Sequence, residues 1–282
     1  MIKRILIAVD GSETAYHALE QALALAKAEQ AEVLVVSVVP AYQGDLRLMG
    51  STEALKGMRE PFAKAFDKAM RAAKAAGVPC TGKLLEGEPY EAILSLAEAE
   101  QVDLVAIGKC GTGFHHLLPM GTVASRIIGL STCDVLIVPD SVQLDTKRIL
   151  LPFDGSAHAR KASDKAMEIA ARYGSELAVL TAVDLPLEGF ALDSSLMERF
   201  TAESRGLQAE VLRMAGGRGV RQTRALVREG HPRAEIVAAV REEQPGLIIM
   251  GSHGRSGLKA LLLGSVAQAV IASGVSPVLI AK

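Results

Sequence analysis

Two stretches of the chain share a spacing of glycines that could bind an anion. In Gly251–Ser265 and in Gly108–Thr122, two glycines three positions apart are followed by nine residues and then by Gly-Ser or Gly-Thr. Glycine tolerates a positive φ and lets a ligand approach the main chain. A helix that begins at the last glycine offers free amide groups and partial positive charge to a phosphate, and the hydroxyl adds a donor. The spacing therefore predicts an anion cradle between a strand end and a helix start in each stretch.

This cradle differs from two familiar phosphate-binding loops. The sequence has no GxxxxGK[ST] stretch, which excludes a P-loop, and no GxGxxG after its first apolar run, which excludes the usual dinucleotide fingerprint. Instead, an apolar run ends in Asp-Gly-Ser at Asp10 and again at Asp154. In an open parallel sheet, ligands bind beyond the carboxyl ends of the strands, where the strand order reverses. We therefore expect each aspartate to face its glycine loop across one crevice.

The chain of 282 residues contains the same unit twice. Lys3–Ser12 (KRILIAVDGS) recurs as Lys147–Ser156 (KRILLPFDGS), and a longer stretch that leads into the first glycine loop recurs before the second. A period of about 140 residues indicates a duplicated domain and not a solenoid repeat. We predict one domain over residues 1-143 and a second over residues 144-282.

Within each unit, apolar runs alternate with helical patterns. The runs at 5–9, 32–39 and 104–108 are continuous, as in strands buried on both faces. Ser12 stands where an N-cap is expected, before apolar residues at helical spacing. The pattern predicts an α/β fold in each half: a doubly wound, Rossmann-like parallel sheet of five strands with helices on both faces and right-handed crossovers.

Together these features resemble the universal stress protein family. The duplicated glycine loops, the VDGS and FDGS strand ends at Asp10 and Asp154, and the closing strands match that family over essentially the whole chain. The resemblance implies a tandem universal stress protein of the ATP-binding-motif type, with strand order 3-2-1-4-5 in each domain. It also implies ATP, or AMP or ADP, at the switch point between strands one and four. Any Mg²⁺ would be carried by the phosphates, and no metal site made of protein ligands is expected.

The resemblance assigns roles to residues by position. Asp154 would contact the base or ribose, Val183 would bound the adenine, and Gly264 would help to hold the phosphates. In the second half the expected nucleotide-binding residues are Pro152, Asp154, Val183, Met250, Gly251, His253, Gly254, Arg255, Gly264, Ser265 and Val266. In the first half they are Asp10, Val39, Gly108, Gly111, Gly121, Thr122 and Val123.

The two halves differ at this site. Ala8 stands where the second half has Pro152, and Lys109-Cys110 stands where it has Ser252-His253. The second half has the usual appearance of the family. We therefore expect both sites to bind and the second to bind more tightly.

Several of these residues also have plainer interpretations. Asp10 and Asp154 could cap the following helix, and His253 and Arg255 could be solvated loop side chains. Cys110 could be a neutral loop residue or a thiol activated by a basic neighbour or a helix start. The adjacent histidines at 115 and 116 do not favour a metal site, because adjacent side chains rarely point at one ion.

Composition narrows the class of protein. The 31 basic and 32 acidic residues give a formal net charge of −1, which argues against a general nucleic-acid binder. Three widely separated cysteines form no CxxC pair and suit a reducing cytoplasm. The apolar run at the N-terminus is too short for a signal peptide, and no later stretch has transmembrane length without a charge or a glycine. We predict a cytoplasmic protein without a membrane or nucleic-acid partner.

Three functions remain open at this point. The leading hypothesis is a regulatory stress-response protein in which adenine-nucleotide occupancy alters a surface for an unknown protein partner. The second is a slow ATPase or nucleotide-transfer enzyme, although no catalytic residues are identified. The third is a scaffold that needs no nucleotide. The family resemblance also implies that the fifth strands of the two domains pair within one chain to form a pseudo-dimer, with a homodimer left open.

Overall fold

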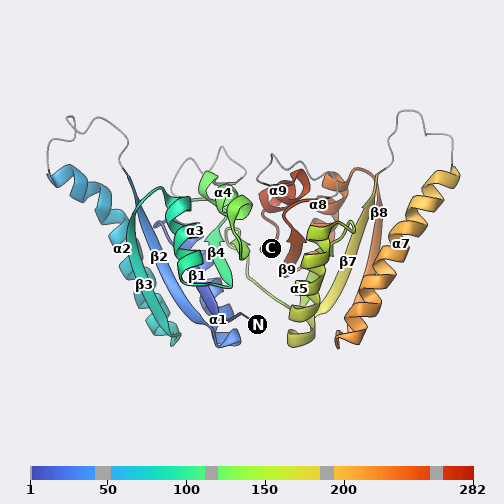
Figure 1. The fold of residues 1–282 in the computed structure, drawn as a ribbon, viewed down its shortest axis with the longest axis horizontal. Helices are drawn as coiled ribbons and strands as arrows, with labels where there is room; N and C mark the ends of the chain where they lie inside the picture. The colour runs from blue at the N-terminus through green and yellow to red at the C-terminus, as the bar shows by residue number, and fades with distance from the viewer. Residues whose placement is uncertain (1, 42–51, 112–119, 185–193, 255–262) are drawn as a thin grey trace. The chain divides into compact units, whose positions relative to one another are not determined.

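The chain folds into two compact units, Met1–Ser141 and Val142–Lys282. The computed structural model describes residues 2–41, 52–111, 120–184, 194–254 and 263–282 (Figure 1). Arg255 of the expected site and the adjacent histidines at 115 and 116 lie outside the described residues.

The first unit is built on a parallel sheet in which β1 is central. Its strands run in the order β3-β2-β1-β4-β5, and the pairs β1–β2, β1–β4, β2–β3 and β4–β5 are all parallel. The order reverses direction between β1 and β4, which is where an open parallel sheet forms a ligand crevice. The strand bounds are β1 Arg4–Ala8, β2 Glu32–Pro40, β3 Cys80–Gly87, β4 Leu104–Gly108 and β5 Asp134–Val138.

Helices cover both faces of this sheet. One face carries α1 and α2, which contact each other, and α2 lies along β2 and β3 (Figure 1). The other face carries α3 and α4, which also contact each other. The helix bounds are α1 Glu13–Glu29, α2 Thr52–Ala76, α3 Pro89–Ala99 and α4 Thr122–Leu130.

The second unit repeats this plan. Its strands follow the order β8-β7-β6-β9-β10, again with parallel pairs, so that β6 and β9 flank the reversal. One face carries α5 and α7, and the other carries α8 and α9. The bounds are β6 Arg148–Pro152, α5 Ala157–Tyr173, β7 Glu176–Val183, α7 Ser194–Gly217, β8 Gln222–Glu229, α8 Pro232–Glu243, β9 Leu247–Gly251, α9 Ser265–Ser273 and β10 Val278–Ala281. The predicted doubly wound α/β class is confirmed.

Local chemistry explains why each unit starts as it does. β1 and β6 are continuous apolar runs whose central side chains are buried. Ser12 and Ser156 are the N-caps of α1 and α5, and each hydroxyl accepts a hydrogen bond of 3.2 Å from the amide three residues later. Gly11 and Gly155 precede these caps with φ of +91° and +78°, a conformation that side chains disfavour. The Asp-Gly-Ser turn is therefore fixed by the glycine and by the cap.

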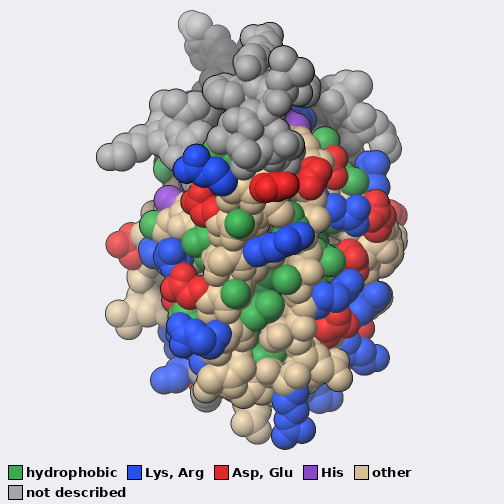
Figure 2. Space-filling view, turned by 90° about the vertical axis from the view of Figure 1, so that its right-hand side faces the viewer, with side chains coloured by type: hydrophobic (Ala, Val, Ile, Leu, Met, Phe, Trp, Pro, Cys, Tyr) green, Lys and Arg blue, Asp and Glu red, His purple; other side chains and the backbone are tan. Residues whose placement is uncertain are grey.

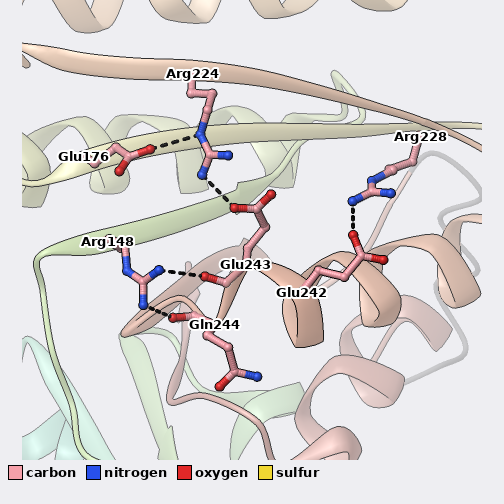
Figure 3. A network of polar contacts seen from close by, with 7 residues as sticks. All are labelled: Arg148, Glu176, Arg224, Arg228, Glu242, Glu243 and Gln244. Carbon is pink, nitrogen blue, oxygen red and sulfur yellow. Dashed lines mark hydrogen bonds and ion pairs between the residues drawn. The ribbon is translucent and has the colours of Figure 1, made fainter.

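A polar network holds the opposite end of the second sheet (Figure 3). Arg148, at the start of β6, donates to the main-chain oxygens of Glu243 and Gln244 at the C-terminus of α8, over 3.0 and 2.8 Å. Arg224 of β8 bridges Glu176 of β7 and Glu243 over 2.9 and 2.7 Å. A cation at a helix C-terminus satisfies exposed carbonyls and the helix dipole. This network holds α8 on the sheet at the end of the strands that lies away from the crevice.

Charge on the surface is mixed. Figure 2 shows Lys and Arg side chains interspersed with Asp and Glu on the face that it draws, as the balanced composition predicts. Between α5 and α7, for example, Arg218 pairs with Asp164 at 2.7 Å and Arg160 with Glu210 at 3.7 Å. None of the helices that the structure describes is both long enough and apolar enough to cross a membrane.

Candidate nucleotide-binding site

An aspartate stands at the carboxyl end of the central strand in each unit. The Asp10 Oδ1 atom accepts hydrogen bonds from the amide and the hydroxyl of Ser12, at 3.0 and 2.6 Å. The Asp154 Oδ1 atom accepts one from the amide of Ser156 at 3.0 Å. One oxygen of each carboxylate therefore holds the turn into α1 or α5, while the serine caps the helix.

The second carboxylate oxygen faces the glycine loop. A Cβ placed on Gly111 would lie 2.5 Å from Asp10 Oδ2, and one placed on Gly254 would lie 2.7 Å from Asp154 Oδ2. Only glycine lets the loop main chain come this close to the carboxylate. The aspartate and the glycine loop thus meet across one crevice, and they do so with the same geometry in both units.

The first glycine of each loop, Gly108 or Gly251, is required for close packing. Gly108 and Gly251 are not among the glycines with positive φ in the described residues. A Cβ on Gly108 would lie 2.9 Å from the main-chain carbon of Thr14, and one on Gly251 would lie 2.7 Å from that of His158. The positive φ that glycine tolerates is therefore not used at these strand ends. These two glycines let the first turn of α1 or α5 pack directly on the strand end.

The last glycine of each loop starts a helix without a side-chain cap. Gly121 and Gly264 are the N-caps of α4 and α9, and neither helix receives a side-chain hydrogen bond at its cap. Their amides donate back to the loop, from Gly121 to the Lys109 oxygen at 3.0 Å and from Gly264 to the Ser252 oxygen at 2.8 Å. Helices begun this way leave their first amides to another acceptor, which is what an anion requires.

A cavity of about 360 Å³ lies in the crevice of the first unit. Six of the seven residues expected there line it: Asp10, Gly108, Gly111, Gly121, Thr122 and Val123. Most of the remaining wall is apolar, and it comes from elements far apart in the sequence: Val36, Val38 and Pro40 of β2, Phe62 of α2, and Ile93 of α3. The cavity volume is within the range of small-molecule sites, about 300–1,000 Å³.

Val39, the seventh expected residue, does not line the cavity; its neighbours Val38 and Pro40 do. Side chains alternate across a strand, so Val36, Val38 and Pro40 share one face of β2 and Val39 is directed to the other. Val39 is nevertheless buried. Among the residues at the end of β2, it is therefore Val38 and not Val39 that faces the cavity.

The second unit places its expected residues in the matching positions. Pro152 is the last residue of β6, Val183 is the last residue of β7, and Met250 precedes Gly251 at the end of β9. Pro152, Val183 and Met250 are buried. Gly264, Ser265 and Val266 form the start of α9, and His253 and Gly254 lie in the loop between. By the offset that moves Val39 to Val38, Ala182 and not Val183 takes the equivalent face of β7.

The cysteines lie in different surroundings. Cys110 lines the cavity, and its main-chain oxygen accepts a hydrogen bond from the hydroxyl of Thr14. Burial raises the pKa of the Cys80 thiol, and burial is also the largest cause of the raised pKa of Cys133.

Within the described residues no group of three His, Cys, Asp or Glu side chains is placed to hold a metal ion.

One residue at the site was not expected from the sequence. His158, in the first turn of α5, packs against Gly251, and its ring lies 5.5 Å from the ring of His253, measured between centroids. His158 occupies the position of Thr14 in the duplicated sequence, so the sequence does show that the two halves differ there. Its contact with the loop only becomes visible once α5 is packed on the strand end.

The family model for universal stress proteins matches residues 1–139 and again residues 145–282. The chain belongs to the universal stress protein family.

Relatives and solved structures agree with this. A universal stress protein of Thermus aquaticus is 38% identical over 142 residues, which is 49% of this chain and 99% of that protein. One from Mycobacterium bovis is 25% identical over 304 residues, covering 99% of this chain and 94% of the relative. The crystal structure of a universal stress protein from Archaeoglobus fulgidus aligns with a TM-score of 0.76 and 23% identity, over 99% of this chain and 96% of that one. At that identity, the last comparison supports the tandem universal stress protein fold alone.

Proposed function

We propose that this universal stress protein binds an adenine nucleotide in the crevice of each unit and that occupancy changes a surface read by a protein partner. The observation that carries the proposal is the cavity of the first unit, which joins an apolar wall to a glycine cradle and an uncapped helix start. These two ends suit the two ends of a nucleotide.

The apolar end of the cavity suits a purine. Val38 from β2, Phe62 from α2 and Ile107 from β4 contribute to the apolar wall, and the carboxylate of Asp10 lines the same cavity. Ligand sites are commonly apolar with a few placed polar groups that fix orientation. We assign the base to this wall and a ribose hydroxyl to Asp10, whose carboxylate is an acceptor.

The glycine end suits phosphates. The amides at the start of α4, with the Thr122 hydroxyl, lie on the cavity wall beside Gly111 and Gly121. An anion at a helix N-terminus is stabilised by free amides and by the helix dipole. A Mg²⁺ ion would enter with the phosphates that carry it.

The second unit repeats the parts that hold the phosphates. Gly254 approaches Asp154 as Gly111 approaches Asp10, and α9 begins at an uncapped glycine as α4 does. We therefore propose a nucleotide site in each unit. We propose further that the second, with Ser252-His253 in the loop, binds more tightly.

Small molecules released from gently purified protein test the proposal. Mass spectrometry of the released fraction is expected to find an adenine nucleotide. Added ATP is expected to raise the melting temperature, since a ligand that binds only the folded state stabilises it. Gly121→Asp combined with Gly264→Asp serves as the matched control, because it places a carboxylate at the start of both α4 and α9. Protein that releases no nucleotide and whose melting temperature is unmoved by ATP would instead favour a nucleotide-independent scaffold.

A further inference from the structure

The two units differ in the pair of side chains that stands beside the crevice. In the second unit this pair is His158 and His253, with ring centroids 5.5 Å apart. The repeat places Thr14 and Cys110 at the same two positions of the first unit. There, the Thr14 hydroxyl donates to the main-chain oxygen of Cys110. The second unit has thus replaced a hydrogen-bonded neutral contact by two imidazoles.

Main-chain packing holds His158, and a side-chain contact holds His253. His158 is the second residue of α5, and its main chain abuts Gly251 closely enough to exclude a Cβ there. His253 follows Ser252, whose buried hydroxyl lies 3.1 Å from the Nδ1 atom of His253. His253 also precedes Gly254, the glycine that faces Asp154. The pair therefore lies between the strand end and the glycine cradle.

The groups around His158 act mostly against its protonation. Partial burial is the largest cause of its lowered pKa, followed by the positive charges of His253, of Lys161 on α5 and of Lys282 after β10. Asp154, at the end of β6, acts in the opposite direction. Arg160, the other basic neighbour on α5, is paired with Glu210 of α7. Among the described residues, the charges that act on the pKa of His158 are thus mostly positive, and Asp154 opposes them.

We propose that His158 and His253 contact the phosphate tail of the nucleotide and that His158 takes up a proton when it binds, so that the second unit binds nucleotide more tightly as the pH falls. The proposal rests on the nucleotide binding proposed above. Imidazole has two ring nitrogens that both donate once it is protonated, and hydrogen bonds between charged partners are the strong ones.

The sign of the effect follows from the charges. A bound polyphosphate adds negative charge beside the pair, which raises the affinity of the imidazoles for protons. The extra affinity for nucleotide is then fully present at pH values below the lowered pKa of free His158, and it disappears as the pH rises above the pKa in the complex. In the first unit, Thr14 and Cys110 stand in the positions of His158 and His253, so neither of these two positions carries an imidazole, the group that changes charge between roughly pH 5.5 and 7.5.

The test measures ATP binding to the full chain by calorimetry at pH 5.5, 6.5 and 7.5. Gly121→Asp is used as the background that weakens the first site, and Gly264→Asp as the background that weakens the second. His158→Thr with His253→Cys gives the second unit the residues of the first, and His158→Gln keeps a hydrogen-bonding side chain without the charge. Arg218→Gln, which removes a charge paired with Asp164 and not among those that act on His158, controls for a general loss of positive charge, and adenosine controls for the base and sugar.

With the second site observed, ATP affinity is expected to rise about tenfold more between pH 7.5 and 5.5 in the parent than in the double variant, because one pH unit of pKa shift corresponds to a factor of ten. Comparing the parent with the double variant at each pH cancels the effect of the titration of ATP itself. Arg218→Gln is expected to keep the slope, adenosine to show none, and the first site to follow the double variant. Equal slopes in parent and double variant, with ATP still bound, would overturn this inference alone. Absence of ATP binding at every pH would overturn it together with the proposed function.

Discussion

The variants Gly251→Ala and Gly254→Ala distinguish a glycine needed for packing, Gly251, from a glycine needed for ligand binding, Gly254. The added Cβ would lie 2.7 Å from both the main-chain carbon and the Cβ of His158, and 2.9 Å from its oxygen. Most of these atoms are main chain in the first turn of α5, so they cannot rotate away. The helix or the strand end must shift instead.

Overpacking of this kind costs about 1–3 kcal/mol. At about 2–4 °C per kcal/mol for a domain of this size, the second unit should melt several degrees lower. Gly254→Ala is the matched comparison, because its Cβ would meet only the end of the Asp154 side chain, at 2.7 Å. We expect that variant to lose less than about 1 kcal/mol, since a carboxylate can rotate, yet to bind ATP more weakly because Asp154 has moved. Gly206→Ala, in α7 with nothing within 4 Å, should gain about 0.5–1 kcal/mol.

The chain has no tryptophan, so the assay is urea and thermal unfolding followed by circular dichroism, without nucleotide. The reasoning is refuted if Gly251→Ala unfolds at the same urea concentration as the parent, or if Gly254→Ala is the more destabilised of the two.

Three further results are expected. Gln208→Ala should cost about 1–3 kcal/mol in urea unfolding and leave ATP affinity unchanged, because the buried amide donates to main-chain oxygens of β7 and β8 at 3.0 and 2.7 Å; a loss of affinity of the same size would contradict this. Labelling of Cys110 by a maleimide should slow when ATP is added, whereas an unchanged rate would remove this thiol from the site. In nuclear magnetic resonance titrations of the free protein, His158 should protonate with a pKa below the ordinary histidine value, chiefly because of its partial burial. Because its folded pKa is lowered, its contribution to stability should fall as the pH falls towards and below the unfolded value, and His158→Gln should abolish that part; a midpoint at or above the ordinary value would contradict the prediction.

The sequence predicts the framework of the site well because several signals agree there. Continuous apolar runs predict buried parallel strands, and Ser12 and Ser156 cap the helices that follow them. The duplication supplies the strongest evidence, since a lone glycine spacing is weak and two copies beside Asp10 and Asp154 are not. The meeting of each aspartate with its glycine loop follows from the rule for open parallel sheets.

The errors have physical reasons. All seven inner residues of β2 are buried, so hydrophobicity does not reveal which face of the strand meets the crevice; Val38 lines the cavity, whereas the expected residue, Val39, does not. A glycine in a sequence does not say whether it serves a positive φ or close packing, and Gly108 serves the second purpose. Phe62 reaches the cavity from α2, across a distance in sequence that no local pattern spans.

Equilibrium dialysis of the full chain against radiolabelled ATP tests the central claim most directly. One nucleotide bound per unit is expected, with one site lost in Gly121→Asp, the other lost in Gly264→Asp, and both lost in the double variant. Retention of ATP that none of these substitutions alters, or no retention at all, would contradict a nucleotide site in the glycine crevices.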